Sequence, residues 1–440
     1  MQADLTISME INESVQQVPT PPGIQDIPND LLELVLLQVP TPACLLRAAA
    51  TCKVWRRVIT GDGFLHRYRS IHGPRLVLGH YAIDYDDSER GDERVRTDFI
   101  PSPPRPATAA TRLYQRVSLD FLPRAMGPYT KLLPTDSRGG LLAVVNGTLW
   151  KNLVVCNPWT RQYRAIHIPW TRPVFAPEDG YCEHNFLGAF LLGGGADDDD
   201  ETTISMSNFR VVYARMVHDD FNNRVTTQAY VYSARDGRFL VLAPPIGPGV
   251  GFQHFGWSRR TLEMFNRFMG RAGGSLFWAV HCGQVLQLDE STVEFSTLAL
   301  PLASNDSTCM LEVEANYDRG NLRVVGGGAR GAVHIVRIVD SDLEVFTRAY
   351  GDRECVLHKR FSLWQLSNLK QDRPERQRWG FWETPSSGAL RLMVSSTSSE
   401  FSIDVETMEL ERISETTYQY AADLLLPYEV TWPHKISDVL

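Results

Sequence analysis

The chain has 440 residues, of which 43% are hydrophobic and 22% are charged, and its formal net charge is −8. This length gives room for about two or three domains, and the composition is that of a folded globular protein, which excludes a fibre and a wholly disordered chain. The acidic balance argues against general nucleic-acid binding, because affinity for phosphates depends on clustered Lys and Arg.

The sequence also indicates where the protein works. No stretch reaches the roughly 18 consecutive apolar residues that a membrane span needs, and the N-terminus has acidic residues where a signal peptide has basic ones. The 7 cysteines are spread along the chain without a C-x-x-C pair, which favours reduced thiols packed as small apolar side chains. We therefore expect a protein of the cytoplasm or nucleus that does not enter a membrane.

The first part of the chain divides into a leader and a helical module. Residues 1–24 are polar, end in VPTPPG and show no periodic pattern, which predicts a disordered leader. Residues 25–72 predict four short helices, because Pro40 ends the first, Pro42 suits the start of the second, and glycines follow the third and fourth. Lys and Arg outnumber Asp and Glu in this module, whereas the rest of the chain is acidic.

The first of these helices, within IPNDLLELVLLQVP, is apolar almost all round. At about 100° per residue, Leu31, Leu32 and Val35 lie toward one side, and other leucines continue nearly opposite. Only Glu33 and Gln38 are polar within its leucine-rich stretch. Such a helix must be covered on more than one side, but three short neighbours cover about one face. Either another protein or the later part of the same chain covers the rest, and periodicity leaves both readings open.

The spacing of residues along this module resembles that of an F-box. The F-box pattern has a Leu-Pro start, a Leu-rich helix, a Leu-Pro turn, a Leu-Leu helix and a Val-Cys-Lys-x-Trp helix. Five elements of this chain match it in order, namely Ile27-Pro28, Leu31-Leu32, Val39-Pro40, Leu45-Leu46 and Thr51-Cys52-Lys53-Val54-Trp55. Ile27 and Thr51 depart mildly from the pattern, and they keep the apolar start and the Cys-Lys-x-Trp core.

The resemblance implies a plant-type F-box protein, the substrate receptor of an SCF-type cullin-RING ubiquitin ligase. In such a complex the F-box binds a Skp-family adaptor, and through it cullin, while the following domain binds a target protein and this subunit performs no bond chemistry. The residues carried over to the adaptor interface, or to the F-box core that supports it, are Ile27, Pro28, Leu31, Leu32, Leu36, Pro40, Leu45, Leu46, Cys52 and Trp55. Arg56 and Arg57 are either a solvated face or an electrostatic rim toward an acidic adaptor, where they would speed association.

After residue 74 the pattern changes to short alternating strands bounded by turn residues, which predicts a large all-β domain over residues 75–440. A weak repeat supports this reading. In it, an Asn, Asp or Ser is followed three residues later by Thr or Asp, and its copies begin at Asn157, Ser233, Asp289 and Asp404. Each copy is typical of a turn between two strands. At about 40 to 50 residues per blade, the domain is expected to be a β-propeller of six or seven blades, with a β-sandwich as the alternative.

Two segments interrupt the predicted strands. Residues 84–111 are charged and Pro-rich, and residues 193–203 are Gly-rich and then acidic, so both are expected to be surface loops. The expected fold class is therefore α+β and multidomain, with a small helical F-box followed by a large all-β domain for substrate recognition.

The sequence lacks common catalytic and cofactor-binding patterns such as G-x-x-x-x-G-K-[ST], G-x-S-x-G and H-E-x-x-H. Cys182, Glu183 and His184 are adjacent ligand types without the spaced second pair that a tetrahedral zinc site requires. We therefore expect no cofactor and no metal. Two alternatives to the ligase subunit stay open: a β-propeller enzyme, such as a hydrolase or lyase, with the helices as a cap, and a non-degradative F-box scaffold.

Overall fold

A computed structural model divides the chain into two compact units, residues 1–74 with 433–440 and residues 75–432. The residues that the structure describes are 27–39, 45, 48–49, 51–61, 63–72, 75–86, 94–101, 117–123, 132–146, 152–168, 182–193, 204–219, 224–242, 268–279, 284–299, 322–326, 333–339, 342–348, 355–367, 379–381, 389–394, 399–405, 407–415 and 424–431. The expected leader at 1–24 lies outside them, as does nearly all of the expected loop at 193–203. None of the helices among these residues is long and apolar enough to cross a membrane.

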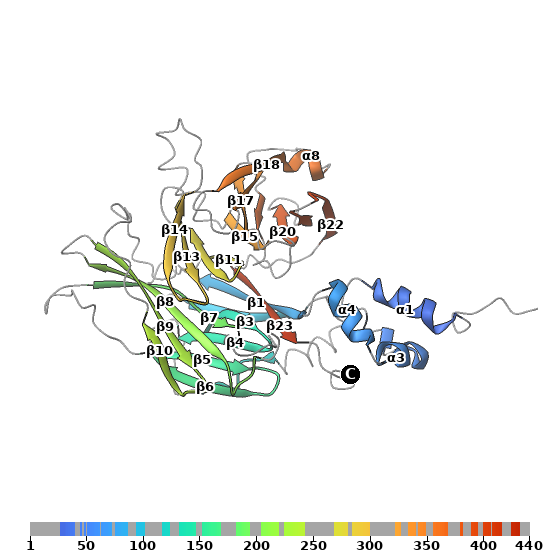
Figure 1. Cartoon of the computed structure of the whole chain (residues 1–440), viewed down its shortest axis with the longest axis horizontal. Coiled ribbons are helices and arrows are strands. Elements are labelled where there is room, and N and C mark those ends of the chain that lie inside the picture. Colours follow the sequence, from blue (N-terminus) through green and yellow to red (C-terminus); the bar gives the residue numbers. More distant parts are fainter. Residues whose placement is uncertain are drawn as a thin grey trace, which may run out of the picture. The chain divides into compact units, whose positions relative to one another are not determined.

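The small helical N-terminal region that the sequence predicts is confirmed (Figure 1). Its helices are α1 (Asn29–Leu37), α3 (Lys53–Ile59) and α4 (Phe64–His72), and helical residues between α1 and α3 include Leu45, Ala48 and Ala49. Gly63 precedes α4 with φ at 81°, a left-handed conformation that a glycine adopts without strain. α1 packs against both α3 and α4.

The second unit is a β-propeller whose described residues form five four-stranded blades (Figure 1). Within each blade the neighbouring strands follow the order of the chain and pair antiparallel. The strands of the five blades are β3 (Leu132–Arg138), β4 (Leu141–Asn146), β5 (Asn152–Asn157) and β6 (Gln162–His167); β7 (Cys182–Leu192), β8 (Arg210–Asp219), β9 (Arg224–Ser233) and β10 (Arg238–Leu242); β11 (Phe268–Ala272), β12 (Ser275–Ala279), β13 (Gln284–Asp289) and β14 (Phe295–Ala299); β15 (Leu322–Gly326), β16 (Val333–Val339), β17 (Asp342–Arg348) and β18 (Val356–Ser362); and β19 (Trp379–Phe381), β20 (Ala389–Val394), β21 (Ser399–Asp404) and β22 (Leu410–Glu415). A short helix, α8 (Leu363–Ser367), follows β18.

A three-stranded sheet joins the two ends of the propeller chain. It pairs β1 (Arg75–Asp86) with β2 (Arg94–Pro101) on one side and with β23 (Leu424–Thr431) on the other. β23 also contacts β3, and the hydroxyl of Tyr428 donates a hydrogen bond to the Gly140 carbonyl at 3.1 Å. The last strand of the unit therefore lies between its first strand and its first blade.

The five four-stranded blades of the described residues correct the expected six or seven. The sequence estimate divided the domain into blades of about 40 to 50 residues. The first strands of successive blades begin at residues 132, 182, 268, 322 and 379, which is 50 residues apart or more. In addition, the described strands at the two ends share one three-stranded sheet.

The expected surface loop at residues 84–111 is also corrected, because it contains the end of β1 and all of β2. Phe99 of β2 is buried, and its ring packs edge-on against Tyr81 of β1 and Tyr428 of β23, with centroids 5.1 and 6.4 Å apart. Alternate residues of a strand face opposite sides, so a segment rich in charged residues still forms a strand when one face carries apolar side chains.

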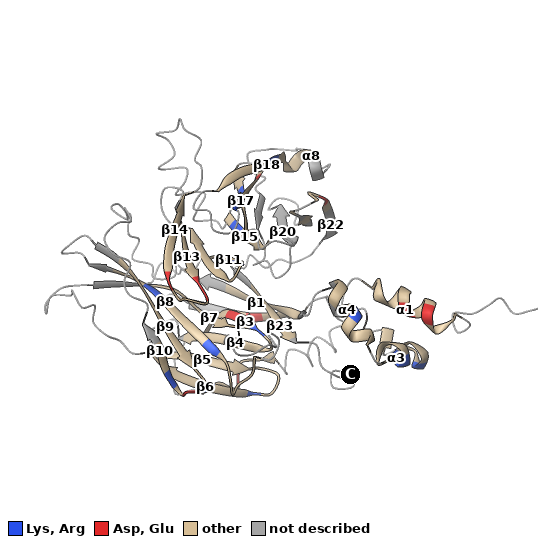
Figure 2. Ribbon diagram, in the orientation of Figure 1, with Lys and Arg blue, Asp and Glu red and all other residues tan. Residues whose placement is uncertain are grey.

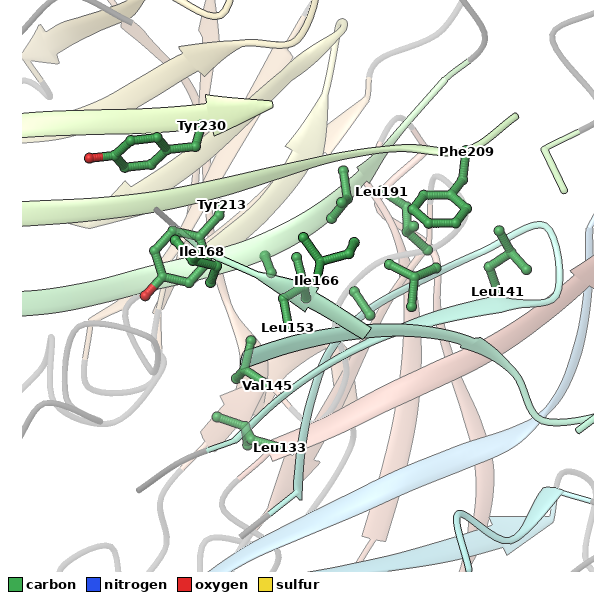
Figure 3. Close-up of a cluster of buried hydrophobic side chains, with 14 of the residues drawn as sticks. Leu133, Leu141, Val145, Leu153, Ile166, Ile168, Leu191, Phe209, Tyr213 and Tyr230 are labelled. Atoms are coloured by element: carbon green, nitrogen blue, oxygen red, sulfur yellow. The ribbon is translucent and has the colours of Figure 1, made fainter. Parts of the chain in front are cut away.

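Buried apolar side chains fill the spaces between successive sheets. Ile83 of β1 packs with side chains of the first and second blades, the cluster drawn in Figure 3. Three further clusters join the second blade to the third, the third to the fourth and the fourth to the fifth. In one of them the fully buried Trp278 of β12 donates its indole N–H to the Leu187 carbonyl of β7 at 2.9 Å. Each blade thus buries its faces against its neighbours in chain order.

The repeat in the sequence marks the turn between the third and fourth strands of four blades. The side chains of Asn157, Ser233 and Asp289 each accept a hydrogen bond from the backbone N–H three residues later, at 3.1, 3.2 and 2.9 Å. The next residue has a positive φ in every copy, with 56° at Arg161, 65° at Gly237, 59° at Val293 and 61° at Met408. The strand-turn-strand interpretation of the repeat is therefore confirmed.

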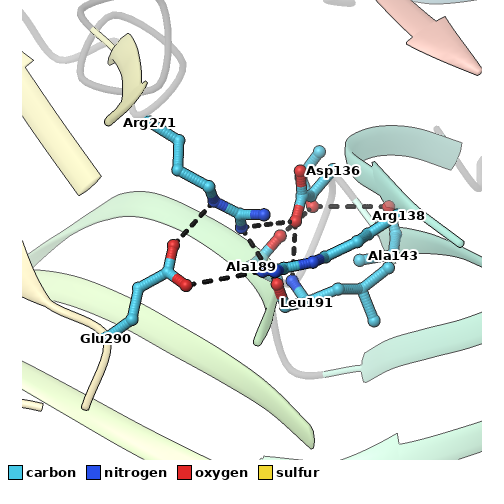
Figure 4. A network of polar contacts seen from close by, with 8 residues as sticks. Asp136, Arg138, Ala143, Ala189, Leu191, Arg271 and Glu290 are labelled. Carbon is cyan, nitrogen blue, oxygen red and sulfur yellow. Dashed lines mark hydrogen bonds and ion pairs between the residues drawn. The ribbon is translucent and has the colours of Figure 1, made fainter. Parts of the chain in front are cut away.

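A network of charged side chains ties together the first strands of the first three blades (Figure 4). Arg271 of β11 donates from Nη2 to Oδ2 of Asp136 on β3 at 2.9 Å and to the Leu191 carbonyl of β7 at 3.0 Å. Its Nε lies 2.7 Å from Oε1 of Glu290, and Nη1 of Arg138 lies 3.5 Å from the other oxygen. Burial alone would lower the pKa of Arg271, because it disfavours the charged guanidinium. The nearby carboxylates of Asp136 and Glu290 favour the charge more strongly, so the pKa of Arg271 lies above its ordinary value. The network keeps these largely buried charges paired.

Candidate functional site

The apolar residues of α1 divide into a buried and an exposed stripe. Leu32 and Leu36 are each 2% exposed and Leu37 is 6% exposed. α1 packs against α3 and α4, whose Ile59 and Tyr68 are also buried. The buried stripe is therefore the core of the helical unit, and it attaches α1 to its two neighbours.

The exposed stripe consists of Leu31, Leu34 and Val35, which are 55%, 58% and 61% exposed. At about 100° per residue the three side chains lie within about 100° of one another, away from the buried stripe. Single exposed leucines are ordinary, whereas neighbouring ones on one helix face form a patch suited to a partner. Burial of one such side chain contributes about 1.5–3 kcal/mol. We therefore take this stripe as the candidate functional site.

Two polar contacts hold the stripe in its orientation. Arg67 of α4 forms an ion pair with Glu33 of α1. Just after α1, the carbonyl of Val39 accepts a hydrogen bond from the hydroxyl of the buried Tyr68 at 2.7 Å. With the buried stripe, these contacts fix the rotation of α1 about its own axis, so the same side chains always face outward.

The residues named from the F-box pattern differ in burial. Leu31 and Pro28 are exposed, Ile27, Cys52 and Trp55 are half-buried, Leu32, Leu36 and Leu45 are buried, and Pro40 and Leu46 lie outside the described residues. Leu32, which the helical period puts beside Leu31 and Val35, belongs to the buried stripe. Conversely, Leu34 and Val35 are exposed although the pattern did not name them.

α3 carries the basic residues of the expected rim, which are drawn in blue in Figure 2. Both Arg56 and Arg57 are exposed. The Nε of Arg56 donates a hydrogen bond to the Ala49 carbonyl at 2.9 Å, so this side chain ties α3 to the segment before it. Arg56 therefore makes a structural contact within the helical region, in addition to the expected electrostatic contact with an acidic adaptor.

Three cysteines have surroundings that suit packing. Cys52 is the residue before α3, and its carbonyl accepts the Arg56 N–H at 2.9 Å. Cys156 and Cys355 are buried in the propeller, and burial raises the pKa of both thiols. Within the described part of the chain, no group of three His, Cys, Asp or Glu side chains is placed to hold a metal ion.

Comparison with protein families finds one match in this part of the chain. Residues 24–72 match the family model described as F-box-like. No curated protein has a sequence that matches this chain.

Solved structures similar to the chain are distant from it. The β-propeller domain of Cps50 (Swd1) from Myceliophteria thermophila is 12% identical, with 66% of this chain and 86% of that chain covered and a TM-score of 0.28. A luciferin-regenerating enzyme is 9% identical, with 70% and 79% covered and a TM-score of 0.30. A protein from Lactobacillus plantarum is 11% identical, with 80% and 98% covered and a TM-score of 0.31. At these scores the likeness carries no argument, and the propeller assignment rests on the chain's own blades.

The family match and the burial of the helices agree on the same segment. The matched range begins before α1 and ends at the last residue of α4, so it contains both the buried core and the exposed stripe. The chain thus carries an F-box-like domain at residues 24–72, followed by a β-propeller.

Proposed function

We propose that this chain is the substrate receptor of an SCF-type cullin-RING ubiquitin ligase, of the plant F-box type. In this proposal the F-box-like domain binds a Skp-family adaptor, which joins it to cullin, and the propeller presents a target protein in the cytoplasm or nucleus. The chain itself makes and breaks no bonds. It raises the effective concentration of the target near the enzymes that transfer ubiquitin.

The observation that carries the proposal is the exposed stripe of Leu31, Leu34 and Val35 on the first helix of an F-box-like domain. Burial of exposed apolar side chains is the dominant favourable term in most protein–protein association. Three such side chains on one face provide the hydrophobic anchor that an adaptor interface needs. The stripe therefore connects the family match to a physical surface.

Leu34→Asp is expected to abolish binding of the full chain to a Skp-family adaptor. The substitution removes an exposed leucine and places a carboxylate where the adaptor would exclude water, which is costly for an unpaired charge. Affinity should fall by at least about 100-fold. Co-expression with the adaptor, followed by affinity purification and a titration of the purified proteins, measures the loss.

Leu240→Asp is the matched control, since Leu240 on β10 is another exposed leucine, at 43%. This variant should bind the adaptor as the wild type does. Failure of the wild-type chain to bind any Skp-family adaptor, or equal binding by Leu34→Asp and wild type, would remove the proposal.

Deletion of residues 1–74 distinguishes the ligase subunit from an enzyme whose helices cap its propeller. The two compact units divide at this position, and β1 begins at Arg75. We expect the remaining propeller to stay folded and to lose all adaptor binding, as measured by circular dichroism and affinity purification. Aggregation of the remainder would favour a cap. The non-degradative scaffold is separated by target abundance, which should rise in cells that lack the chain only if the target is degraded.

A further inference from the structure

Gln38 adds one polar side chain to the exposed stripe of α1. It follows Leu34 by four positions and Val35 by three, and residues at these spacings lie side by side on a helix. Gln38 is the C-cap residue that follows α1, and its φ of −84° and ψ of −5° keep it in the helical region. Gln38 is exposed, and its spacing places it on the same side of the helix as the apolar stripe.

The surroundings of Gln38 are well fixed. Its backbone N–H donates to the Val35 carbonyl at 3.1 Å, and the N–H of Val39 donates to the Leu36 carbonyl at 3.2 Å. The hydrogen bond from Tyr68 to the Val39 carbonyl holds the next residue. Rotation of α1 about its axis would break the contact with Tyr68 of α4. A protein that covers the stripe therefore also covers Gln38.

The amide of Gln38 needs partners once water is excluded. A glutamine side chain has two N–H donors and a carbonyl acceptor. Among the residues that the structure describes, none forms a hydrogen bond with this side chain. Removing an amide from water without a new hydrogen bond is unfavourable, so a wholly apolar adaptor surface would bind this stripe poorly.

We propose that Gln38 is a specificity-determining residue of the adaptor interface: a Skp-family adaptor recognised by this chain presents a hydrogen-bonding group opposite the Gln38 amide. The inference rests on the proposed function and adds to it a criterion for choosing between adaptors. The apolar stripe supplies attraction to any adaptor with a hydrophobic surface. Gln38 penalises those that leave its amide unpaired, because sites built around a polar group reject surfaces that lack the partner.

The test compares adaptor affinity of the full chain before and after Gln38→Met. Methionine has nearly the shape of glutamine and a good helix propensity, so the substitution removes the hydrogen-bonding groups and keeps the helix. Isothermal titration with a purified Skp-family adaptor should show binding weakened by about 5- to 100-fold, because the polar group of the adaptor is left buried and unpaired. Gln162→Met is the matched control, since Gln162 is an exposed glutamine on β6, and it should leave the affinity unchanged.

A double-mutant cycle then identifies the partner group. Polar residues on the adaptor face that contacts α1 are replaced by alanine one at a time, and one of these changes should weaken wild-type binding but have little further effect on Gln38→Met. Hydrogen exchange of α1 in the free Gln38→Met chain should match the wild type, which excludes local unfolding as the cause.

The outcomes separate this inference from the function on which it rests. If the wild type binds the adaptor, Leu34→Asp does not, and Gln38→Met binds as tightly as the wild type or more tightly, the role of Gln38 is overturned and the adaptor interface stands. If the wild type binds no Skp-family adaptor, both are overturned. Weaker binding by Gln38→Met with no coupled adaptor residue would overturn the hydrogen bond.

Discussion

Replacement of Arg271 by methionine is expected to destabilise the propeller by about 3–5 kcal/mol, the usual cost of removing one partner from a buried ion pair. Arg271 lies 2.9 Å from Asp136 and 2.7 Å from Glu290, and all three side chains are 20% exposed or less. Without the guanidinium, Asp136 keeps the Leu191 N–H as a hydrogen-bond donor but loses its arginine. Two carboxylates would then share this largely buried site with Arg138 alone.

Urea unfolding followed by tryptophan fluorescence measures this effect, because the fully buried Trp278 lies in the same blade as Arg271. Arg360→Met is the control. Arg360 pairs with Asp342 at 3.0 Å, but its side chain is 56% exposed, so its loss should change stability by less than about 1 kcal/mol. Equal destabilisation by the two substitutions would contradict the view that burial makes the Arg271 network important.

The helical unit was predictable from sequence because its signals are local. Proline and glycine positions mark the helix ends, and the matching residues of the F-box pattern lie within a short segment. The outward face of α1 was not predictable, because a helix that is apolar almost all round has no distinctive period. Its faces are decided by contacts from α4, such as those of Arg67 with Glu33 and Tyr68 with Val39, which lie 34 and 29 positions apart.

The β-propeller shows the same division between local and distant information. Alternating residues predicted strands, and Asn157, Ser233 and Asp289 predicted turns, because each side chain bonds a backbone group three residues away. The number of blades was mistaken because it depends on which strands share a sheet. β1 pairs with β23 from the other end of the unit, and no local pattern records that pairing.

The charged network around Arg271 could not be predicted from the sequence for a similar reason. Asp136 and Arg271 are 135 positions apart, and each one alone reads as an ordinary surface charge. Only the packing of successive blades brings them together. The fold therefore adds to the sequence mainly the contacts between segments that are distant along the chain. Such contacts build the charged network of the propeller, and they decide which face of α1 is left exposed.

Leu36→Asp is expected to unfold the helical unit, whereas Leu34→Asp leaves it folded. Leu36 is 2% exposed and Leu34 is 58% exposed, so the two leucines of one helix face opposite environments. Loss of the buried leucine removes about 1.5–3 kcal/mol, and burial of a carboxylate adds a penalty of several more. A domain as small as the F-box-like domain at residues 24–72 has little stability to lose, so this sum exceeds it.

Hydrogen exchange of the full chain separates the two variants. In Leu36→Asp, the amides of α1, α3 and α4 should exchange as in an unfolded chain while the propeller strands keep their protection. In Leu34→Asp, all of these amides should remain as protected as in the wild type. Both variants should fail to bind the adaptor, but for different physical reasons. Leu36→Asp has no folded F-box-like domain, whereas Leu34→Asp has a folded domain with a charged docking face. Protected helices in a Leu36→Asp chain that fails to bind would contradict the assignment of Leu36 to the buried core.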